Sequence, residues 1–335
     1  MMLDRFTLPF DTSPMVETYF NVAYVYAIAS AHIDPRDHPA WISEKYINCL
    51  YAAESADQKL YTAIWDHTSE KKGLMRYQKM DLPKDIFPLI HLDFTALTKR
   101  SLLAGVYPNF RLRWKYILPE GDPRLMERVQ ESVIIGWSEA KRVFILKRSS
   151  PDFHLCTYEI GYDIFEAAVR DVPDEAVVVH FWEYIGTDRL EVDFNEIRVG
   201  LTDYLSSQNS KMADPKRIPY GVAAIRRWLE DCAVRVQAGG RLEEHYFRVL
   251  KEHKDLMLLR MQFLASQGIV NGEIVNQAKE NHELAASTAR LALEMNENRT
   301  TELFQMIRQS VETILENEIR YLPSVIASLA ETHVS

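Results

Sequence analysis

A thiol and an imidazole lie two residues apart in the middle of the chain, and together they could supply a nucleophile and its base. His154 and Cys156 belong to the stretch FHLCTYEIGYD (153–163), which the pattern predicts to be a strand. Residues i and i+2 of a strand point to the same side, so both groups would share one face. The pattern favours the simpler alternative, a buried thiol beside an edge histidine.

The remaining histidines suggest little chemistry. His180 stands in the apolar run VVVHFW, where we expect a core histidine bonded to backbone. His245 and His253 are eight residues apart on one predicted helix, and we interpret them as surface residues. No histidine pair shows the i, i+4 spacing of a zinc-binding helix, so no metal site is predicted.

Cofactor motifs are also missing from the sequence. It contains no GxGxxG, no GxxxxGK[ST] and no GxSxG, and its 12 glycines are scattered. We therefore expect no cofactor. The formal net charge of −9 disfavours nucleic acid as a partner, because neutralising phosphates requires a surplus of Lys and Arg.

Composition predicts a cytoplasmic protein with no membrane partner. The three cysteines are odd in number and widely spaced, which fits a reducing compartment. No run reaches the roughly 18 apolar residues of a membrane-spanning helix. The first residues also lack the basic start and apolar core of a secretion signal.

Helices are predicted at the start of the chain. The first covers 14–33, with Ser13 as its cap and Pro14 in its first turn, and its apolar sides place it in the core. A second, amphipathic helix is expected over 40–56 and includes Cys49. A third is expected over 85–105.

The middle of the chain, 106–194, is rich in predicted strands. The clearest is a hairpin formed by SVIIGW (132–137) and RVFILK (142–147) around the loop SEAK. Further strands are expected at 106–118, 153–163, 176–184 and 189–194, with a short helix at 163–172.

The last third of the chain is predicted to be helical. Apolar residues recur at helical spacing over 219–235, 242–268, 272–295 and 300–331. The polar tract 206–217 precedes these helices as a linker or loop. The predicted fold class is therefore α+β, with an α+β domain over 1–205 and an all-helical domain over 218–335.

Five segments carry a resemblance to a known family. They are LAGVYPNFRLRWKYIL (103–118), SVIIGWSEAKRVFILK (132–147), IGYDIFEAA (160–168), RIPYGVAAI (217–225) and EHKDLMLLRMQFL (252–264). In these segments the sequence resembles the family of butirosin biosynthesis protein H. That resemblance implies a papain-like domain, with an N-terminal core helix and an antiparallel sheet, and a carrier-protein-dependent acyltransferase of antibiotic biosynthesis.

This sequence departs from the family's Cys-His-Asp triad at all three positions. The cysteine place falls on Phe20 or Asn21, and the aspartate place falls on Lys147. The histidine place falls on Gln130, or on Glu131 if the register is shifted by one residue. Neither Phe nor Asn can form an acyl thioester, and an amide is no general base near neutral pH. These five residues are predicted to line a groove that keeps its shape without its nucleophile, as in a pseudoenzyme.

Two functions remain open for this groove. In the first, the protein acts on or binds an acyl or peptidyl carrier protein or its product, with an amine or peptide as acceptor. Catalysis would then be amide-forming acyl transfer without a Cys nucleophile. In the second, it is a non-catalytic binding or scaffold protein. A third possibility is a helical interaction protein with an unrelated β-rich module. The long C-terminal helices either cover the groove or form the surface of a homodimer.

Overall fold

The structure is a computed structural model. It describes residues 4–18, 20–45, 47–52, 59–62, 74–87, 92–118, 126–150, 154–186, 191–210 and 219–332. The chain divides into two compact units. The first unit comprises 1–33 and 68–188, and the second comprises 34–67 and 189–335. This division differs from the predicted boundary at 205, because His38–Glu44, Cys49–Ala52 and Phe194–Ser206 pack with the helices of the last third.

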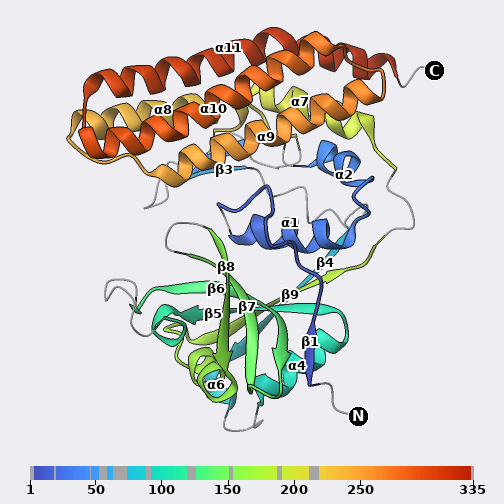
Figure 1. Cartoon of the computed structure of the whole chain (residues 1–335), viewed down its shortest axis with the longest axis vertical. Helices are drawn as coiled ribbons and strands as arrows, with labels where there is room; N and C mark the ends of the chain where they lie inside the picture. Colours follow the sequence, from blue (N-terminus) through green and yellow to red (C-terminus); the bar gives the residue numbers. More distant parts are fainter. Residues whose placement is uncertain are drawn as a thin grey trace. The chain divides into compact units, whose positions relative to one another are not determined.

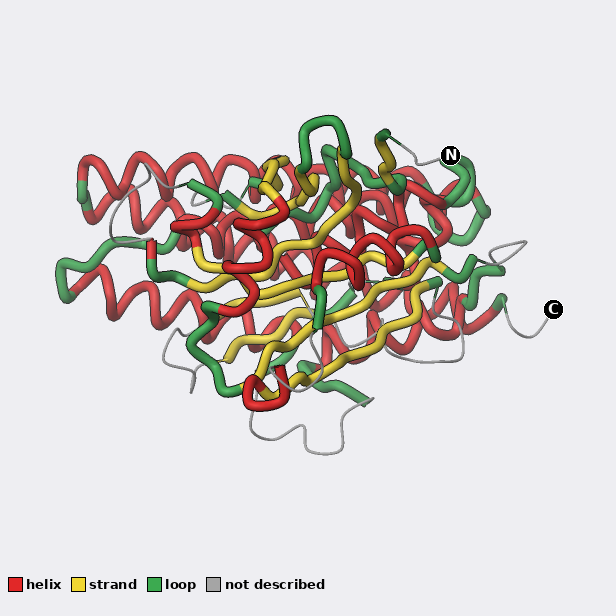
Figure 2. Tube along the Cα trace, turned by 90° about the horizontal axis from the view of Figure 1, so that it is seen from below, coloured by secondary structure: helices red, strands yellow, loops and turns green. Residues whose placement is uncertain are grey.

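The first unit is built on a seven-stranded antiparallel sheet (Figures 1 and 2). Six strands follow the order β4-β9-β5-β6-β7-β8, and β1 pairs with the last residues of β6, beyond those that pair with β5. The strands are β1 (Arg5–Thr7), β4 (Met75–Pro83), β5 (Val106–Arg113), β6 (Val129–Ser138), β7 (Val143–Ser149), β8 (Leu155–Gly161) and β9 (Ala176–Tyr184). The predicted α+β class is confirmed by this sheet and its helices.

Each face of this sheet is covered by different helices. On one face, Tyr24, Ala27 and Ile28 of α1 (Phe20–His32) pack against strand side chains that include Val133 and Ile135. We call this the α1 face. The opposite face carries a larger apolar core, to which α4 (Phe94–Leu103) and α6 (Tyr162–Arg170) contribute. We call it the α6 face.

Glycine is required where β1 meets β6. Gly136 pairs with Thr7, and a Cβ at Gly136 would come within 2.9 Å of the Thr7 Cα and closer still to the Phe6 carbonyl oxygen. The register of β6 with β7 also shifts between Ile134 and Gly136. The missing side chain therefore lets β1 approach β6 closely.

Several predicted elements of the first unit start or end elsewhere. The helix expected over 14–33 begins only at Phe20, and the backbone N–H of Ser13 donates to Asp11 Oδ1 instead of starting a helix. The helix expected over 85–105 is shorter, because Asp93 caps α4 by accepting from the backbone N–H of Ala96. Strand β4 was not predicted at all.

The second unit consists mainly of helices, which run alongside one another in Figure 1. They are α2 (His38–Glu44), α7 (Phe194–Ser206), α8 (Gly221–Gln237), α9 (Glu244–Ser266), α10 (Gly272–Asn298) and α11 (Thr301–Glu331). The four helices predicted for the last third are thereby confirmed as α8 to α11. Local signals set their starts, since Asn271 caps α10 and Thr300 caps α11.

Two predictions for the second unit are wrong. The helix expected over 40–56 ends at Glu44, and β2 (Cys49–Ala52) follows as a strand that pairs with β3 (Lys59–Thr62). The strand expected over 189–194 is replaced at its end by α7, because the Asp193 carboxylate caps that helix. Residues 211–217 of the predicted linker lie outside the described part of the chain. Within the described ranges, no helix has the length and apolar character needed to cross a membrane.

Candidate functional site

Two of the five predicted groove residues share the α1 face. Lys147 pairs with Val133, whose side chain packs under α1, and Glu131 lies two residues before Val133 on the same strand. Because strand side chains alternate, Glu131, Val133 and Lys147 all point to the α1 face. Lys147 is buried, and its Nζ lies 5.6 Å from the centroid of the Phe10 ring. This burial lowers the pKa of its ammonium group.

Gln130 points to the opposite face. Its side-chain oxygen accepts a hydrogen bond from Trp114 Nε1 at 3.1 Å, and its amide nitrogen donates to the Ser149 carbonyl at 3.3 Å. Of the two alternatives for the histidine place, Glu131 is therefore the one on the α1 face.

Phe20 and Asn21 form the first turn of α1, but their side chains lie outside the described residues. One turn later, the hydroxyl of Tyr24 donates to the backbone carbonyl of Glu131 at 2.9 Å. That contact joins α1 to the strand that carries Glu131. Convergence of the Phe20 and Asn21 side chains with Lys147 stays a prediction.

A polar chain crosses four neighbouring strands of the α1 face. The Tyr77 hydroxyl lies 2.6 Å from His180 Nδ1, and His180 Nε2 lies 4.0 Å from Glu131 Oε1. Asn109 Nδ2 donates to Glu131 Oε2 at 3.0 Å. We call these four residues, from β4, β9, β5 and β6, the His180 cluster.

Strand register places these side chains on the α1 face. Asn109 pairs with Val133 on one side and with His180 on the other, so all three point the same way. Tyr77 pairs with Trp182, two residues after His180, and their rings are 4.6 Å apart. Asn109 is fully buried, whereas 18% of the His180 side chain and 38% of Tyr77 are exposed. The phenol of Tyr77 is thus the most accessible group of the cluster.

Burial favours the uncharged form of each titratable group in the cluster. It raises the pKa of the Glu131 carboxyl, although Asn109 and Arg111 oppose this shift. It lowers the pKa of the His180 imidazole, and the positive charge of Lys79 adds to that effect. It also raises the pKa of the Tyr77 phenol. The lowered pKa of His180 favours the neutral imidazole at neutral pH. In the tautomer that carries its proton on Nε2, the phenol donates to Nδ1 and Nε2–H faces Glu131.

This order of groups resembles a triad with a phenol in the place of the nucleophile. His180 can take the proton of Tyr77 at Nδ1, and the charged imidazolium would then lie next to the Glu131 carboxylate. Asn109 holds the carboxylate in position through its amide. The cluster can therefore accept a proton from a group that binds at the Tyr77 hydroxyl, and return it later.

Sequence reasoning misjudged His180 and missed two of its neighbours. The prediction of a core histidine bonded to backbone is wrong, because His180 is partly exposed and bonds to the Tyr77 side chain. Tyr77 was overlooked since β4 carries mostly exposed, mixed side chains. Alternation along 176–184, which puts His180 on the face of Trp182, was the available signal.

None of the three cysteines lies on the α1 face. Cys156 pairs with Arg148, so it points to the α6 face, and His154 instead lies 3.1 Å from Glu17 Oε2. Cys49 and Cys232 are buried in the second unit, where burial raises the pKa of each thiol to about 12. Thiols of that kind are poor nucleophiles. Within the residues described, no group of three or more His, Cys, Asp or Glu side chains could hold a metal ion.

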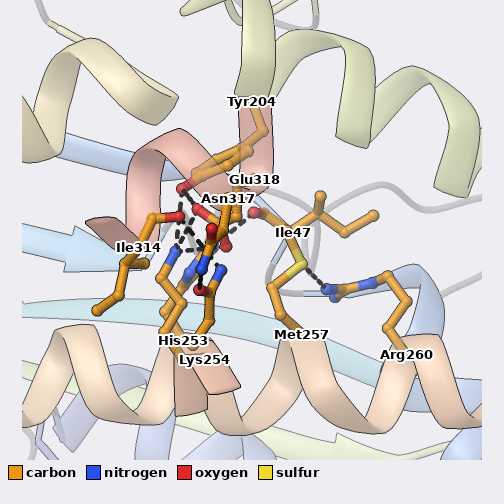
Figure 3. A network of polar contacts seen from close by, with 10 residues as sticks. Ile47, Tyr204, His253, Lys254, Met257, Arg260, Ile314, Asn317 and Glu318 are labelled. Carbon is orange, nitrogen blue, oxygen red and sulfur yellow. Dashed lines mark hydrogen bonds and ion pairs between the residues drawn. The ribbon is translucent and has the colours of Figure 1, made fainter. Parts of the chain in front are cut away.

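A second polar cluster lies inside the helical unit (Figure 3). Lys254 Nζ of α9 lies 2.8 Å from both carboxylate oxygens of Glu318 on α11, and both side chains have no exposed surface. The Tyr204 hydroxyl of α7 donates to the same carboxylate at 2.6 Å. We call these three residues the Lys254 cluster. Because it is sealed from solvent and joins three helices, we interpret it as a structural contact and not as a reactive site.

Neighbouring groups on α9 extend this cluster. His253 Nε2 lies 2.8 Å from the Ile47 carbonyl (Figure 3). Arg260 donates to the carbonyls of Ser43 and Lys45. Arg260 thereby satisfies carbonyls at the end of α2, which a short helix leaves unpaired. The expectation that His253 is a surface residue is wrong, since it is fully buried.

Comparison with protein-family models finds no matching family, and comparison with curated proteins finds no match.

Proposed function

We propose that the first unit is a papain-like domain of secondary-metabolite biosynthesis that binds an acyl or peptidyl group presented by a carrier protein. In this proposal, the unit transfers the group to an amine, and the His180 cluster replaces a cysteine-based triad. The observation that carries the proposal is the position of His180 between the Tyr77 hydroxyl and the Glu131 carboxylate.

Two features of the α1 face support this reading. First, Glu131 and Lys147, at two of the three triad places, share the face on which α1 packs. Second, the His180 cluster on that face links the exposed Tyr77 side chain to the partly buried Glu131 carboxylate. A reaction on this face has no cysteine available, so the acceptor itself must attack the carrier-bound acyl group.

The proposed reaction is thioester aminolysis. The nitrogen of a neutral amine attacks the thioester carbonyl carbon, and the carbon–sulfur bond then breaks. The amine loses one proton to the Tyr77 oxygen as the phenol proton moves to His180 Nδ1. The reverse transfer returns a proton to the departing thiolate, which leaves as the carrier thiol. General acid–base help of this kind typically accelerates a reaction about 10²–10⁴-fold, and positioning adds on the order of 7 kcal/mol or more.

The test is amide formation from an acylated carrier protein and a small primary amine, measured by mass spectrometry. We expect the wild-type protein to exceed the uncatalysed rate. His180→Gln should lower the rate by about 10²-fold or more, and Tyr77→Phe should lower it comparably. Cys156→Ser, on the α6 face, is the matched control and should leave the rate unchanged.

Two outcomes would contradict catalysis by this cluster. One is no acceleration over the mixture without protein, across several carriers and amines. The other is an acceleration that survives in both His180→Gln and Tyr77→Phe. Circular dichroism of each variant establishes that the loss of rate does not come from unfolding.

A specific observation favours a second candidate, non-catalytic binding at the same face. The groups of the His180 cluster already bond to one another, since the Tyr77 hydroxyl lies 2.6 Å from His180 Nδ1 and Asn109 donates to Glu131. A ligand N–H would then donate to the Tyr77 hydroxyl oxygen without any proton transfer. Carrier or peptide binding that weakens in Tyr77→Phe, with no amide formed by the wild type, would select this candidate.

A further inference from the structure

A fully buried arginine lies on the α6 face of the first unit. Arg148 belongs to β7 and has no exposed surface. Its guanidinium carbon lies 4.0 Å from the centroid of the Trp114 ring, and its Nη2 donates to the Leu112 carbonyl at 3.2 Å. Trp114 is held in place by its hydrogen bond to Gln130. The aromatic ring thus covers one side of the guanidinium.

The rest of this guanidinium has no partner among the described residues. Nε and Nη1 of Arg148 are buried and make no hydrogen bond, and no described carboxylate forms an ion pair with them. Burial lowers the pKa of Arg148 to about 10, so the group remains charged at neutral pH. A buried charge with two unused donors is strongly unfavourable unless an anion or polar group satisfies it.

A second unused donor stands beside Arg148. Ser132 is fully buried, and its hydroxyl has no hydrogen-bond partner. It precedes Val133, which pairs with Lys147, and Arg148 follows Lys147 on the neighbouring strand. Since strand side chains alternate, Ser132 and Arg148 both point to the α6 face, side by side on adjacent strands.

We propose that Arg148 and Ser132 form an internal binding site for a small anion of the size of chloride. The Nε–H of Arg148 and the Ser132 hydroxyl supply two donors beside one positive charge, and a single halide ion can accept from both. Both side chains are fully buried, and the Trp114 ring covers one side of the guanidinium, which favours a small monoatomic anion over a larger one such as phosphate. Gln130 acts as a positioning residue because it fixes Trp114.

Thermal unfolding of the full chain at constant ionic strength tests this site, with chloride replaced stepwise by gluconate. A ligand that binds only the folded state raises stability with its concentration, so the transition of the first unit should move upward as chloride replaces gluconate. Arg148→Met should abolish this dependence. Arg142→Met, which removes an exposed arginine at the neighbouring hairpin, should keep it.

Ser132→Ala serves if Arg148→Met does not fold, because it removes one neutral donor and no charge. It should raise the half-saturating chloride concentration about tenfold, the loss expected for one hydrogen bond to a charged group. In crystals grown with bromide, an anomalous peak should appear between Arg148 and Ser132. A transition that is insensitive to chloride in the wild type, or a bromide map without that peak, would overturn the proposal.

Discussion

The Lys254 cluster makes a quantitative prediction about stability. Lys254→Met removes one charge from an ion pair whose two side chains are completely buried. Among the described residues, the fully buried Glu318 carboxylate then keeps the Tyr204 hydroxyl as its one hydrogen-bond donor. Breaking a buried pair on one side typically costs about 3–5 kcal/mol, and we expect a loss of this size in the free energy of unfolding of the second unit.

Two further variants separate the destabilisation caused by an unpaired buried charge from the net contribution of the ion pair to the free energy of unfolding. Lys254→Met combined with Glu318→Leu removes both charges and should recover most of the loss, because apolar side chains of similar volume often replace buried pairs at little cost. Lys279→Met is the surface control. Its ammonium lies 3.9 Å from Glu283, and both side chains are about two-thirds exposed, so we expect a change within about 1 kcal/mol.

The assay is urea unfolding at pH 7, followed by circular dichroism at 222 nm, which reports mainly on the helices of the second unit. The midpoints of all variants are compared at a common denaturant slope. A loss below about 1 kcal/mol for Lys254→Met would refute the reasoning, since it would mean that water solvates the Glu318 carboxylate. A double variant as unstable as the single one would refute it as well, because the penalty would then come from packing.

Three further predictions follow from burial and backbone geometry. The stability of the second unit should fall as the pH drops below about 6.5. Burial lowers the pKa of His253, so below that pH the unfolded chain binds one more proton than the folded chain. In urea titrations, His253→Gln should flatten this pH dependence. Gly136→Ala should lower the stability of the first unit by about 1–3 kcal/mol, because the new Cβ forces β1 away from β6. Gly272→Ala is the control, since the space around Gly272 is open, and it should not destabilise the second unit. Equal effects of the two variants in thermal unfolding would contradict the close approach of β1 to β6. Iodoacetamide should alkylate Cys156 before Cys49 and Cys232, as peptide mass spectrometry would show; early modification of Cys49 would contradict its burial.

Local patterns in the sequence were strong enough to predict much of the secondary structure. The hairpin of β6 and β7 follows from two apolar runs around a polar turn, and the helices α8 to α11 follow from apolar residues at helical spacing. Strand β2 was not predicted because its residues also fit a helical pattern, and only pairing with β3 decides between helix and strand. Strand β4 was not predicted because an exposed edge strand carries no apolar alternation.

For the candidate site, the sequence singled out Glu131 and Lys147 by their places along two strands. It could not choose between Gln130 and Glu131, because a shift of one residue exchanges the two faces of a strand, and only pairing with β5 and β7 fixes the register. The sequence also did not predict which residues lie next to Glu131. Tyr77 and His180 are 103 residues apart in the chain and meet only because β4 and β9 are adjacent in the sheet.

By itself, therefore, the sequence determined the α+β class, the long helices and the absence of a cysteine from the predicted triad places. These properties depend on residue type and on spacing within a few turns or one hairpin. Only the tertiary structure decided that His180 lies between a phenol and a carboxylate, and that Lys254 and Arg148 are buried. Both outcomes depend on contacts between distant segments, which local patterns do not encode.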